Sequence, residues 1–335
     1  IYPTIFFVET IAKHYNIPAV NFMQGYEPCF DNGEIYSWAE LACRNSQNIL
    51  AISQFLKEKC KTNFRKDATV IPNAINTDLI YNTNKKRKEK VSITMDLRNS
   101  FPKGDFLLNE ILKKLTLKDY NIEINVIYVK KTMFPINNNQ NIKINYYEGP
   151  LNRKEVSNIL FDTDIFIDAS LMEGFGLMSL EAMAAGAVPI VGESFGIDEY
   201  AKDNENSFII KEINNVDKYI EKIEILLKDS KRLSDMSKKA QETALKFDMD
   251  ANIPKYIEYF KSVKKQKIEL TSQEKEASEK WSVSEDSIFS KEEENIEKQA
   301  NVISKKRKIY YALLKPFPKK LKIKVKNFLK KLVED

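Results

Sequence analysis

Short apolar runs alternate with amphipathic stretches through the first part of the chain. Three runs have the length and composition of buried strands: 17–23, 48–53 and 70–73. Two stretches have helical spacing: 34–45 and 54–61. Strands that alternate with helices predict a parallel α/β sheet. The basic, polar stretch 85–90 then marks a boundary, so residues 1–84 are expected to form one domain.

The same alternation restarts after this boundary and continues to residue 246. The predicted strands are 91–96, 122–129, 142–147, 165–169 and 187–191. The predicted helices are 104–115, 153–161, 179–185, 216–228 and 231–246. This pattern predicts a second doubly wound domain at 85–246, in which a ligand would bind at the carboxyl ends of the strands.

The C-terminal part has a different composition. An amphipathic helix at 247–263 is expected to pack back toward the first domain, and 264–304 is predicted to be a charged linker or exposed helix. Residues 305–335 combine many lysines with apolar residues at roughly helical spacing: Ile323, Val325, Phe328, Leu329 and Leu332. This tail favours an amphipathic helix over 305–332 on an anionic membrane surface. Packing onto the body is the alternative, and nucleic acid is disfavoured because no recognition motif accompanies the charge.

Composition narrows the class of protein. The 335 residues are 43% hydrophobic and 30% charged with a net charge of +5, which is typical of a globular protein. Three cysteines without paired spacing, Cys29, Cys43 and Cys60, indicate a reducing, cytoplasmic setting. One histidine, His14, excludes a histidine-rich metal site and is interpreted as a surface or packing residue. The chain opens at Ile1 without Met or a basic leader, so N-terminal sequence is expected to be missing.

Residues 164–186 carry most of the chemical information. They predict a buried strand, a Glu-Gly-x-Gly turn and a helix that begins near Leu177. Glycines let the backbone approach a ligand closely, and free amides at the start of a helix suit a phosphate. The carboxylates of Glu173 and Glu181 suit sugar hydroxyls as acceptors. The alternative is a turn whose glycines serve packing and whose glutamates are solvated.

With seven residues between its two glutamates, this segment resembles the signature of the family 4 retaining glycosyltransferases, which have the GT-B fold. Four more elements of that family follow the family's order: the interdomain turn at 71–76, Arg98 with Lys103-Gly104, Gly149, and Gly196 with Glu199. The resemblance covers about residues 71–210. It implies an α/β GT-B fold of two Rossmann-like doubly wound domains facing a cleft, the first incomplete, plus a helical charged tail.

The resemblance also implies roles for single residues. Arg98, Lys103 and Gly104 would hold the diphosphate of a nucleoside diphosphate sugar without metal and without any cofactor. Glu173 would contact the transferred sugar as a catalytic residue, and Glu181 would accept hydrogen bonds from the ribose or deoxyribose. The donor-binding set is completed by the turn residues Gly174, Phe175, Gly176 and Leu177.

The run Gln24, Gly25, Tyr26, Glu27 and Pro28 resembles a subgroup that builds rhamnose-containing bacterial surface polysaccharides. It implies an acceptor-side loop, with Gln24 as a catalytic candidate where many family members have a histidine. Gly25 replaces the aspartate of the subgroup. The alternative is a loop that only ends a strand.

Together these features predict a cytoplasmic retaining hexosyltransferase, peripheral on the inner membrane face through its tail. It would move a hexosyl or deoxyhexosyl unit to a growing glycan or lipid-linked acceptor. Two alternatives stay open: a non-catalytic sugar-nucleotide or glycan-binding subunit, and a GT-B sugar-nucleotide 2-epimerase. The epimerase is disfavoured because it needs several acid and base groups, usually including histidines.

Overall fold

A computed structural model describes residues 17–26, 42–44, 46–82, 89–98, 100–129 and 139–263, with Val8, Ala12 and Lys85. Within these residues the chain forms two parallel sheets, one of three strands and one of six. The structure does not describe Cys29, His14, Glu27 or Pro28, nor the predicted segments 264–304 and 305–335.

The first sheet has the order β1-β2-β3. Its strands are β1 (Asn21–Met23), β2 (Ile49–Ala51) and β3 (Thr69–Val70), and α3 (Gln54–Phe64) connects the last two. Helix α3 begins after Ser53, whose hydroxyl accepts a hydrogen bond from the Leu56 amide. It ends where Arg65 takes a left-handed conformation and its N–H donates to the Cys60 carbonyl.

The second sheet has the order β6-β5-β4-β7-β8-β9. Its strands are β4 (Val91–Leu97), β5 (Ile122–Tyr128), β6 (Lys143–Glu148), β7 (Ile165–Asp168), β8 (Val188–Gly192) and β9 (Phe208–Ile210). All five pairings are parallel. Counted from β4, this is the doubly wound order 3-2-1-4-5-6, and its direction reverses between β4 and β7. Ligands of such sheets bind at that switch point.

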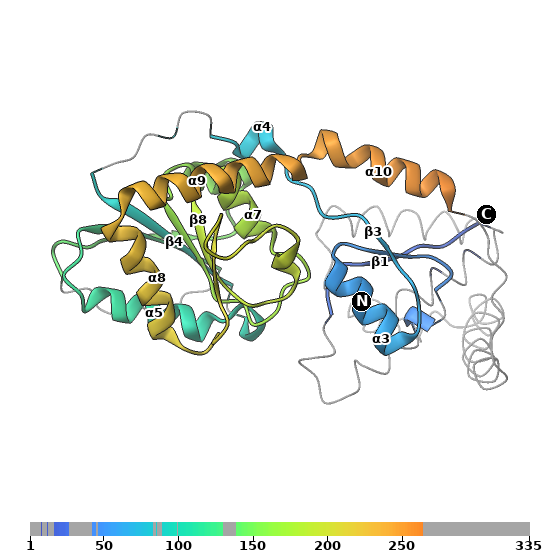
Figure 1. Cartoon of the computed structure of the whole chain (residues 1–335), viewed down its shortest axis with the longest axis horizontal. Helices are drawn as coiled ribbons and strands as arrows, with labels where there is room; N and C mark the ends of the chain where they lie inside the picture. Colours follow the sequence, from blue (N-terminus) through green and yellow to red (C-terminus); the bar gives the residue numbers. More distant parts are fainter. Residues whose placement is uncertain are drawn as a thin grey trace, which may run out of the picture. The chain divides into compact units, whose positions relative to one another are not determined.

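Helices cover both faces of the second sheet (Figure 1). Helix α5 (Asp105–Thr116) packs against α8 (Val216–Lys228) on one face. Helix α7 (Leu177–Ala184) packs against α6 (Arg153–Phe161) and α9 (Ser230–Ala244) on the other. Because side chains alternate along a strand, Ile93, Met95 and Leu97 of β4 enter the core with α5, while Ser92, Thr94 and Asp96 lie on the α6 face.

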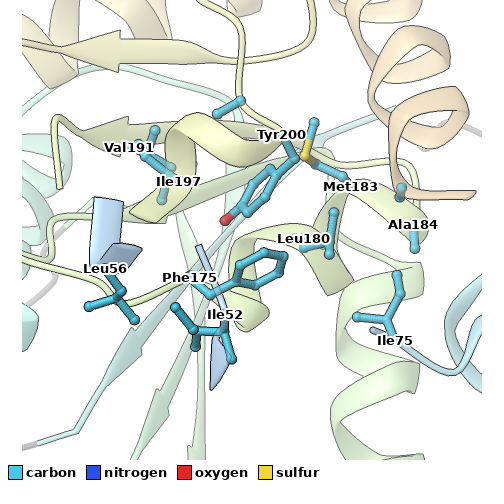
Figure 2. Packing of buried hydrophobic residues seen from close by; sticks show 14 of the residues in the cluster. Ile52, Leu56, Ile75, Phe175, Leu180, Met183, Ala184, Val191, Ile197 and Tyr200 are labelled. Carbon is cyan, nitrogen blue, oxygen red and sulfur yellow. The ribbon is translucent and has the colours of Figure 1, made fainter. Parts of the chain in front are cut away.

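A second hydrophobic cluster joins elements of both sheets (Figure 2). It contains Ile52 and Leu56 from the first sheet and its helix, and Leu180 and Met183 from α7. The Phe175 ring lies between these groups, 5.5 Å from the Tyr200 ring centroid to centroid. Burial on this scale stabilises each large side chain by about 1.5–3 kcal/mol, so the loop of Phe175 is anchored from both sides.

The last described helix returns from the second sheet to the first. Helix α10 (Met249–Ser262) begins after η4 (Leu245–Phe247), with Asp248 accepting from the Asp250 amide at 2.8 Å. The Tyr256 hydroxyl donates to the carbonyls of Ile71 at 3.1 Å and Pro72 at 3.2 Å. These contacts place α10 against the chain that follows β3.

The structure shortens the predicted strands of the first sheet and adds two elements. The run 17–23 pairs only over Asn21–Met23, and the run 70–73 becomes Thr69–Val70. Strand β9 and helix α4 (Thr77–Ile80) were not predicted. Both are too short for a periodic pattern to identify, and β9 forms because its backbone pairs with β8.

Candidate functional site

A cavity of about 740 Å³ opens at the carboxyl ends of β4 and β7. The predicted residues that line it are Gln24, Arg98, Lys103, Glu173, Gly174, Phe175, Gly176, Leu177 and Glu181. The parallel sheet brings them together because β4 and β7 are adjacent and both chain segments leave the sheet at the same edge. Of the predicted donor residues, only Gly104 does not line the cavity.

Three glycines lie in or against the turn between β7 and α7, and each occupies a position that a larger residue would disturb. A Cβ on Gly174 would lie 2.2 Å from the carbonyl oxygen of Gln24, and one on Gly196 would lie 2.5 Å from that of Glu173. Gly176 has a φ of +80° and accepts a 2.6 Å hydrogen bond from the Tyr200 hydroxyl. The glycine pattern therefore serves close packing of three backbone segments. It also leaves the start of α7, whose first residues line the cavity, without a side-chain cap.

Lys103 is held at the site by the residue that follows it. Gly104 has a φ of +67°, and a Cβ there would lie 2.0 Å from the carbonyl oxygen of Ala169. The Leu171 amide donates to the Pro102 carbonyl at 2.9 Å, which ties the short helix η2 (Phe101–Lys103) to the end of β7. Gly104 thus acts on the site by permitting this approach of two backbones.

Lys103 and Glu173 form an ion pair inside the cavity, with Nζ 2.5 Å from Oε1. The Glu173 side chain is only 10% exposed. Burial raises the pKa of Glu173, Asp168 raises it further, and Lys103 opposes both. Burial lowers the pKa of Lys103, but the carboxylates of Glu173 and Asp168 together raise it more, so the net shift is upward. The pair holds both charges at the place where the β7–α7 turn meets η2.

Glu181 pairs with a cation that the sequence had not indicated. An Arg153 Nη1 atom donates to Glu181 Oε1, and both side chains line the cavity. Arg153 opens α6 directly after Asn152, which forms a capping box with Glu155. The capping box is the sequence feature that could have pointed to Arg153. It fixes the start of α6 and so places Arg153 in the segment that follows the preceding strand.

Two aspartates at the switch point, Asp96 and Asp168, also line the cavity although the sequence analysis does not single them out. Asp168 accepts from the Ser170 amide and the Ser179 hydroxyl, both at 2.9 Å, and so braces the turn against α7. Asp96 accepts from Arg98 Nε at 2.6 Å, and burial raises its pKa while Arg98 lowers it. Both are the polar residues nearest the ends of adjacent parallel strands, which is the signal that could have found them.

The predicted acceptor-side loop is divided by the structure. Gln24 lines the cavity, and its carbonyl approaches Gly174. Tyr26 instead is buried: its ring packs 6.4 Å from Phe55 and its hydroxyl accepts from Asn63. The Tyr26 side chain thus fills the core under α3 and does not line the cavity. Gly25 contacts Gly174 without lining the cavity, and Glu27 lies outside the described residues.

The Gly196–Glu199 element, predicted from the resemblance, forms the short helix η3. Its Glu199 carboxylate accepts from the Gln54 amide at the start of α3, and burial raises the pKa of Glu199. Next to it, the Phe195 ring stacks on Phe55 with centroids 5.0 Å apart. This element therefore connects the donor-side turn to the first sheet.

The described residues contain neither a candidate metal-binding cluster nor a helix that could span a membrane. No cluster of three or more His, Cys, Asp or Glu side chains in them has an arrangement that could hold a metal ion. No helix in that part of the chain combines the length and the apolar character needed to cross a membrane.

The chain is similar in sequence to known glycosyltransferases. Residues 137–243 match the family model described as glycosyl transferases group 1. A trehalose synthase of Pyrococcus horikoshii is 28% identical over 189 residues, which are 52% of this chain and 45% of that protein. An N,N'-diacetylbacillosaminyl-diphospho-undecaprenol alpha-1,3-N-acetylgalactosaminyltransferase of Campylobacter jejuni is 31% identical over 111 residues, 33% of this chain and 29% of that protein.

The fold also matches solved structures. The structure of Anabaena Alr3699/HepE in complex with UDP and glucose aligns with a TM-score of 0.65 at 13% identity, covering 78% of this chain and 76% of that one. Similarity at this level establishes the fold, and it confirms the predicted GT-B class. The chain spans about half the length of the trehalose synthase that it resembles.

Proposed function

We propose that the chain is a retaining glycosyltransferase that transfers a hexosyl or deoxyhexosyl unit from a nucleoside diphosphate sugar to a growing glycan. The observation that carries the proposal is the single cavity at the switch point. It gathers the predicted cations Arg98 and Lys103, the buried carboxylates of Glu173 and Glu181, and a glycine turn at the start of α7. Residues 137–243, which match the glycosyl transferases group 1 model, include Glu173, Glu181 and the glycine turn.

Each group has a role that follows from its chemistry. The guanidinium of Arg98 and the ammonium of Lys103 neutralise the diphosphate, and the first amides of α7 donate to it. Glu173 accepts hydrogen bonds from the transferred sugar, and Glu181 accepts them from the ribose. The acceptor oxygen bonds to the sugar C1 on the face from which the diphosphate departs, as the bond from C1 to the phosphate oxygen breaks. That phosphate oxygen takes the proton of the acceptor hydroxyl, so retention requires no protein nucleophile.

The carboxylates begin in ion pairs, which shapes how the donor binds. Glu173 contacts Lys103, and Glu181 contacts Arg153. A bound diphosphate competes with Glu173 for Lys103, and ribose hydroxyls compete with Arg153 for Glu181. Donor binding therefore exchanges internal pairs for ligand pairs, which keeps the buried carboxylates partnered in both states.

The acceptor is proposed to be a lipid-linked or surface glycan. Gln24 lines the cavity on the side of the first sheet, where an acceptor hydroxyl would enter. The Campylobacter relative carries a diphospho-undecaprenol acceptor in its name, which supports a lipid-linked acceptor here. The rhamnose-polysaccharide subgroup remains a prediction, carried by Gln24, Tyr26 and Glu27 in the sequence.

A donor panel tests the function. The intact chain would be incubated with UDP-, GDP- and dTDP-sugars while release of the nucleoside diphosphate is followed, with Arg98→Ala as the matched control. We expect release from one nucleotide class in the wild type and a strong loss in the variant. Tight binding without release would instead indicate a non-catalytic sugar-nucleotide-binding subunit, and an epimerised sugar would indicate a 2-epimerase.

Metal independence is a separate part of the proposal. Two side-chain cations and helix amides supply the positive charge at the diphosphate, so donor affinity should be the same with EDTA and with Mg²⁺. Isothermal titration of the donor under both conditions measures this directly. A large loss of affinity on chelation would contradict the proposed mode of diphosphate binding.

A further inference from the structure

Asp96 is a buried carboxylate in the cavity that none of the proposed roles uses. It is the sixth residue of β4 and lies at the switch point, where its side chain is 9% exposed and lines the cavity. Its Oδ1 atom is buried and has no hydrogen-bond partner among the described residues. A buried carboxylate oxygen without a partner is costly, so its retention here calls for a compensating function.

The contact between Asp96 and Arg98 is specific. Asp96 Oδ2 accepts from Arg98 Nε at 2.6 Å, which engages the side of the guanidinium nearest the chain. A guanidinium has five N–H donors in a rigid fork, so this contact leaves the four on its terminal nitrogens available. Within the described residues those terminal nitrogens have no hydrogen-bond partner, and the Arg98 side chain is 47% exposed at the cavity.

Resting on the proposed function, we infer that Asp96 is a positioning residue: it fixes the Arg98 guanidinium through Nε so that its terminal nitrogens face the diphosphate of the donor. A flexible arginine loses side-chain entropy when it binds a ligand, and an arginine held beforehand loses less. The two residues are separated only by Leu97, so the strand end itself sets their spacing.

The hydrogen-bond partners of Asp96 differ from those of the other carboxylates in the cavity. Both oxygens of Asp168 are already engaged, by Ser170 and Ser179, and Glu173 faces Lys103. Asp96 is thus the carboxylate whose only polar partner in the described structure is the arginine. A carboxylate beside a diphosphate repels it, so Asp96 aids binding only through what it does to Arg98.

A double-mutant cycle separates this role from direct contact. Affinities for UDP, GDP and dTDP would be measured by isothermal titration with the intact chain as wild type, Asp96→Ala, Arg98→Ala and the double variant. We expect Asp96→Ala to weaken binding of the preferred diphosphate about tenfold, the scale of one charge-assisted hydrogen bond. In the Arg98→Ala background the same change should cause no further loss of affinity, because the arginine that Asp96 positions is gone and only its repulsion of the diphosphate is removed.

The isosteric variant Asp96→Asn keeps the test decisive if the alanine variant does not fold. Its side-chain oxygen can still accept from Arg98 Nε, so we expect a loss of less than about threefold. A larger loss in Asp96→Asn would overturn the inference, as would unchanged or tighter binding by Asp96→Ala, or an equal loss with and without Arg98. A wild-type chain that binds none of the three diphosphates would remove the proposed function itself, and this inference with it.

Discussion

Every cation in the cavity faces a carboxylate. Arg98 contacts Asp96, Lys103 contacts Glu173, and Arg153 contacts Glu181. In each pair the carboxylate is the buried member, with 9–11% of its side chain exposed, while the cation is 41–72% exposed. The buried carboxylates therefore form the wall of the site, and the cations paired with them are the members that a ligand can reach.

The substitution Glu181→Gln tests whether the Glu181 carboxylate contributes to nucleotide-sugar binding. The change keeps the shape of the side chain but removes the charge that would accept ribose hydroxyls, so we expect nucleotide-sugar affinity to fall by about 1–3 kcal/mol. Arg153 is 72% exposed, so water can solvate it and folding should be little affected. Isothermal titration measures the affinity, and Glu155→Gln on the neighbouring helix is the control. An unchanged dissociation constant would remove Glu181 from the site.

Glu173 should make stability depend on pH. Burial foremost, and then Asp168, raises its pKa above the ordinary 4.5, so the folded chain holds this proton more tightly than the unfolded chain. Its contribution to the free energy of unfolding is therefore full below pH 4.5 and is lost as pH rises through the raised pKa. The advantage of the wild type over Glu173→Gln should shrink as the pH is raised from below 4.5 toward neutral.

Urea unfolding of both proteins across that range measures the difference. Glu221→Gln is the control, because Lys218 lowers the pKa of Glu221 and the small effect of that variant should have the opposite slope. If the difference between wild type and Glu173→Gln stays constant with pH, Glu173 is not perturbed in the folded chain.

At the scale of elements, one strained turn connects the donor side to α3. Phe195 has a φ of 69° and a ψ of −60°, and the Gly196 amide donates to the Ser194 carbonyl at 2.9 Å, which closes a γ-turn around it. The same amide donates to the Glu173 carbonyl at 3.1 Å. Since bulky residues rarely adopt this conformation, the stack of Phe195 on Phe55 must offset its cost.

Two substitutions separate the stack from the strain. Phe195→Ala removes the stack and keeps the strained backbone, so we expect a loss of about 0.5–1.5 kcal/mol in the free energy of unfolding. Phe195→Gly also relieves the strain and should be about 1 kcal/mol more stable than the alanine variant. Denaturant unfolding of the three proteins gives both differences. A glycine variant less stable than the alanine variant would show that the turn is not strained.

At the scale of the whole molecule, three connections join the two sheets around the cavity. Gly174 meets Gln24, Glu199 meets the amide of Gln54, and Tyr256 of α10 meets the carbonyls after β3. The interdomain turn at 71–76 thus lies beside α10, and Thr77 donates to Asp248 at the start of that helix. The chain enters and leaves the second sheet at one place, which is the natural position for a hinge.

The basic tail is predicted to act at this scale too. Residues 305–332 lie outside the described residues, and the predicted membrane role comes from their sequence alone. Several lysines, each contributing up to about 1 kcal/mol near an anionic surface, should give reversible binding that weakens in salt. Co-sedimentation with phosphatidylglycerol vesicles, with and without residues 305–335, measures this. Equal binding by both forms, or none by the intact chain at low salt, would contradict a membrane role.

The sequence by itself determined five of the six strands of the second sheet, because those strands and the helices between them are long enough for hydrophobic periodicity to locate them. Helix α6 lies at the predicted 153–161, and the strand, glycine turn and helix around Glu173 lie where the motif placed them. The same motif singled out Glu181, and a separate family element singled out Arg98 and Lys103. All three line one cavity, since the parallel topology brings the residues after adjacent strands to one edge.

Only the tertiary structure decided the partners of those residues. Local signals place Arg153 at a helix start and Asp96 and Asp168 at strand ends, but those signals do not show that the three side chains line one cavity. Tyr26, which the motif assigned to the acceptor, turns into the core because α3 packs over it. Short strands such as β9 exist through pairing with a neighbour. Periodicity records which face of an element is buried, whereas the contacts between segments distant in sequence depend on how those faces pack.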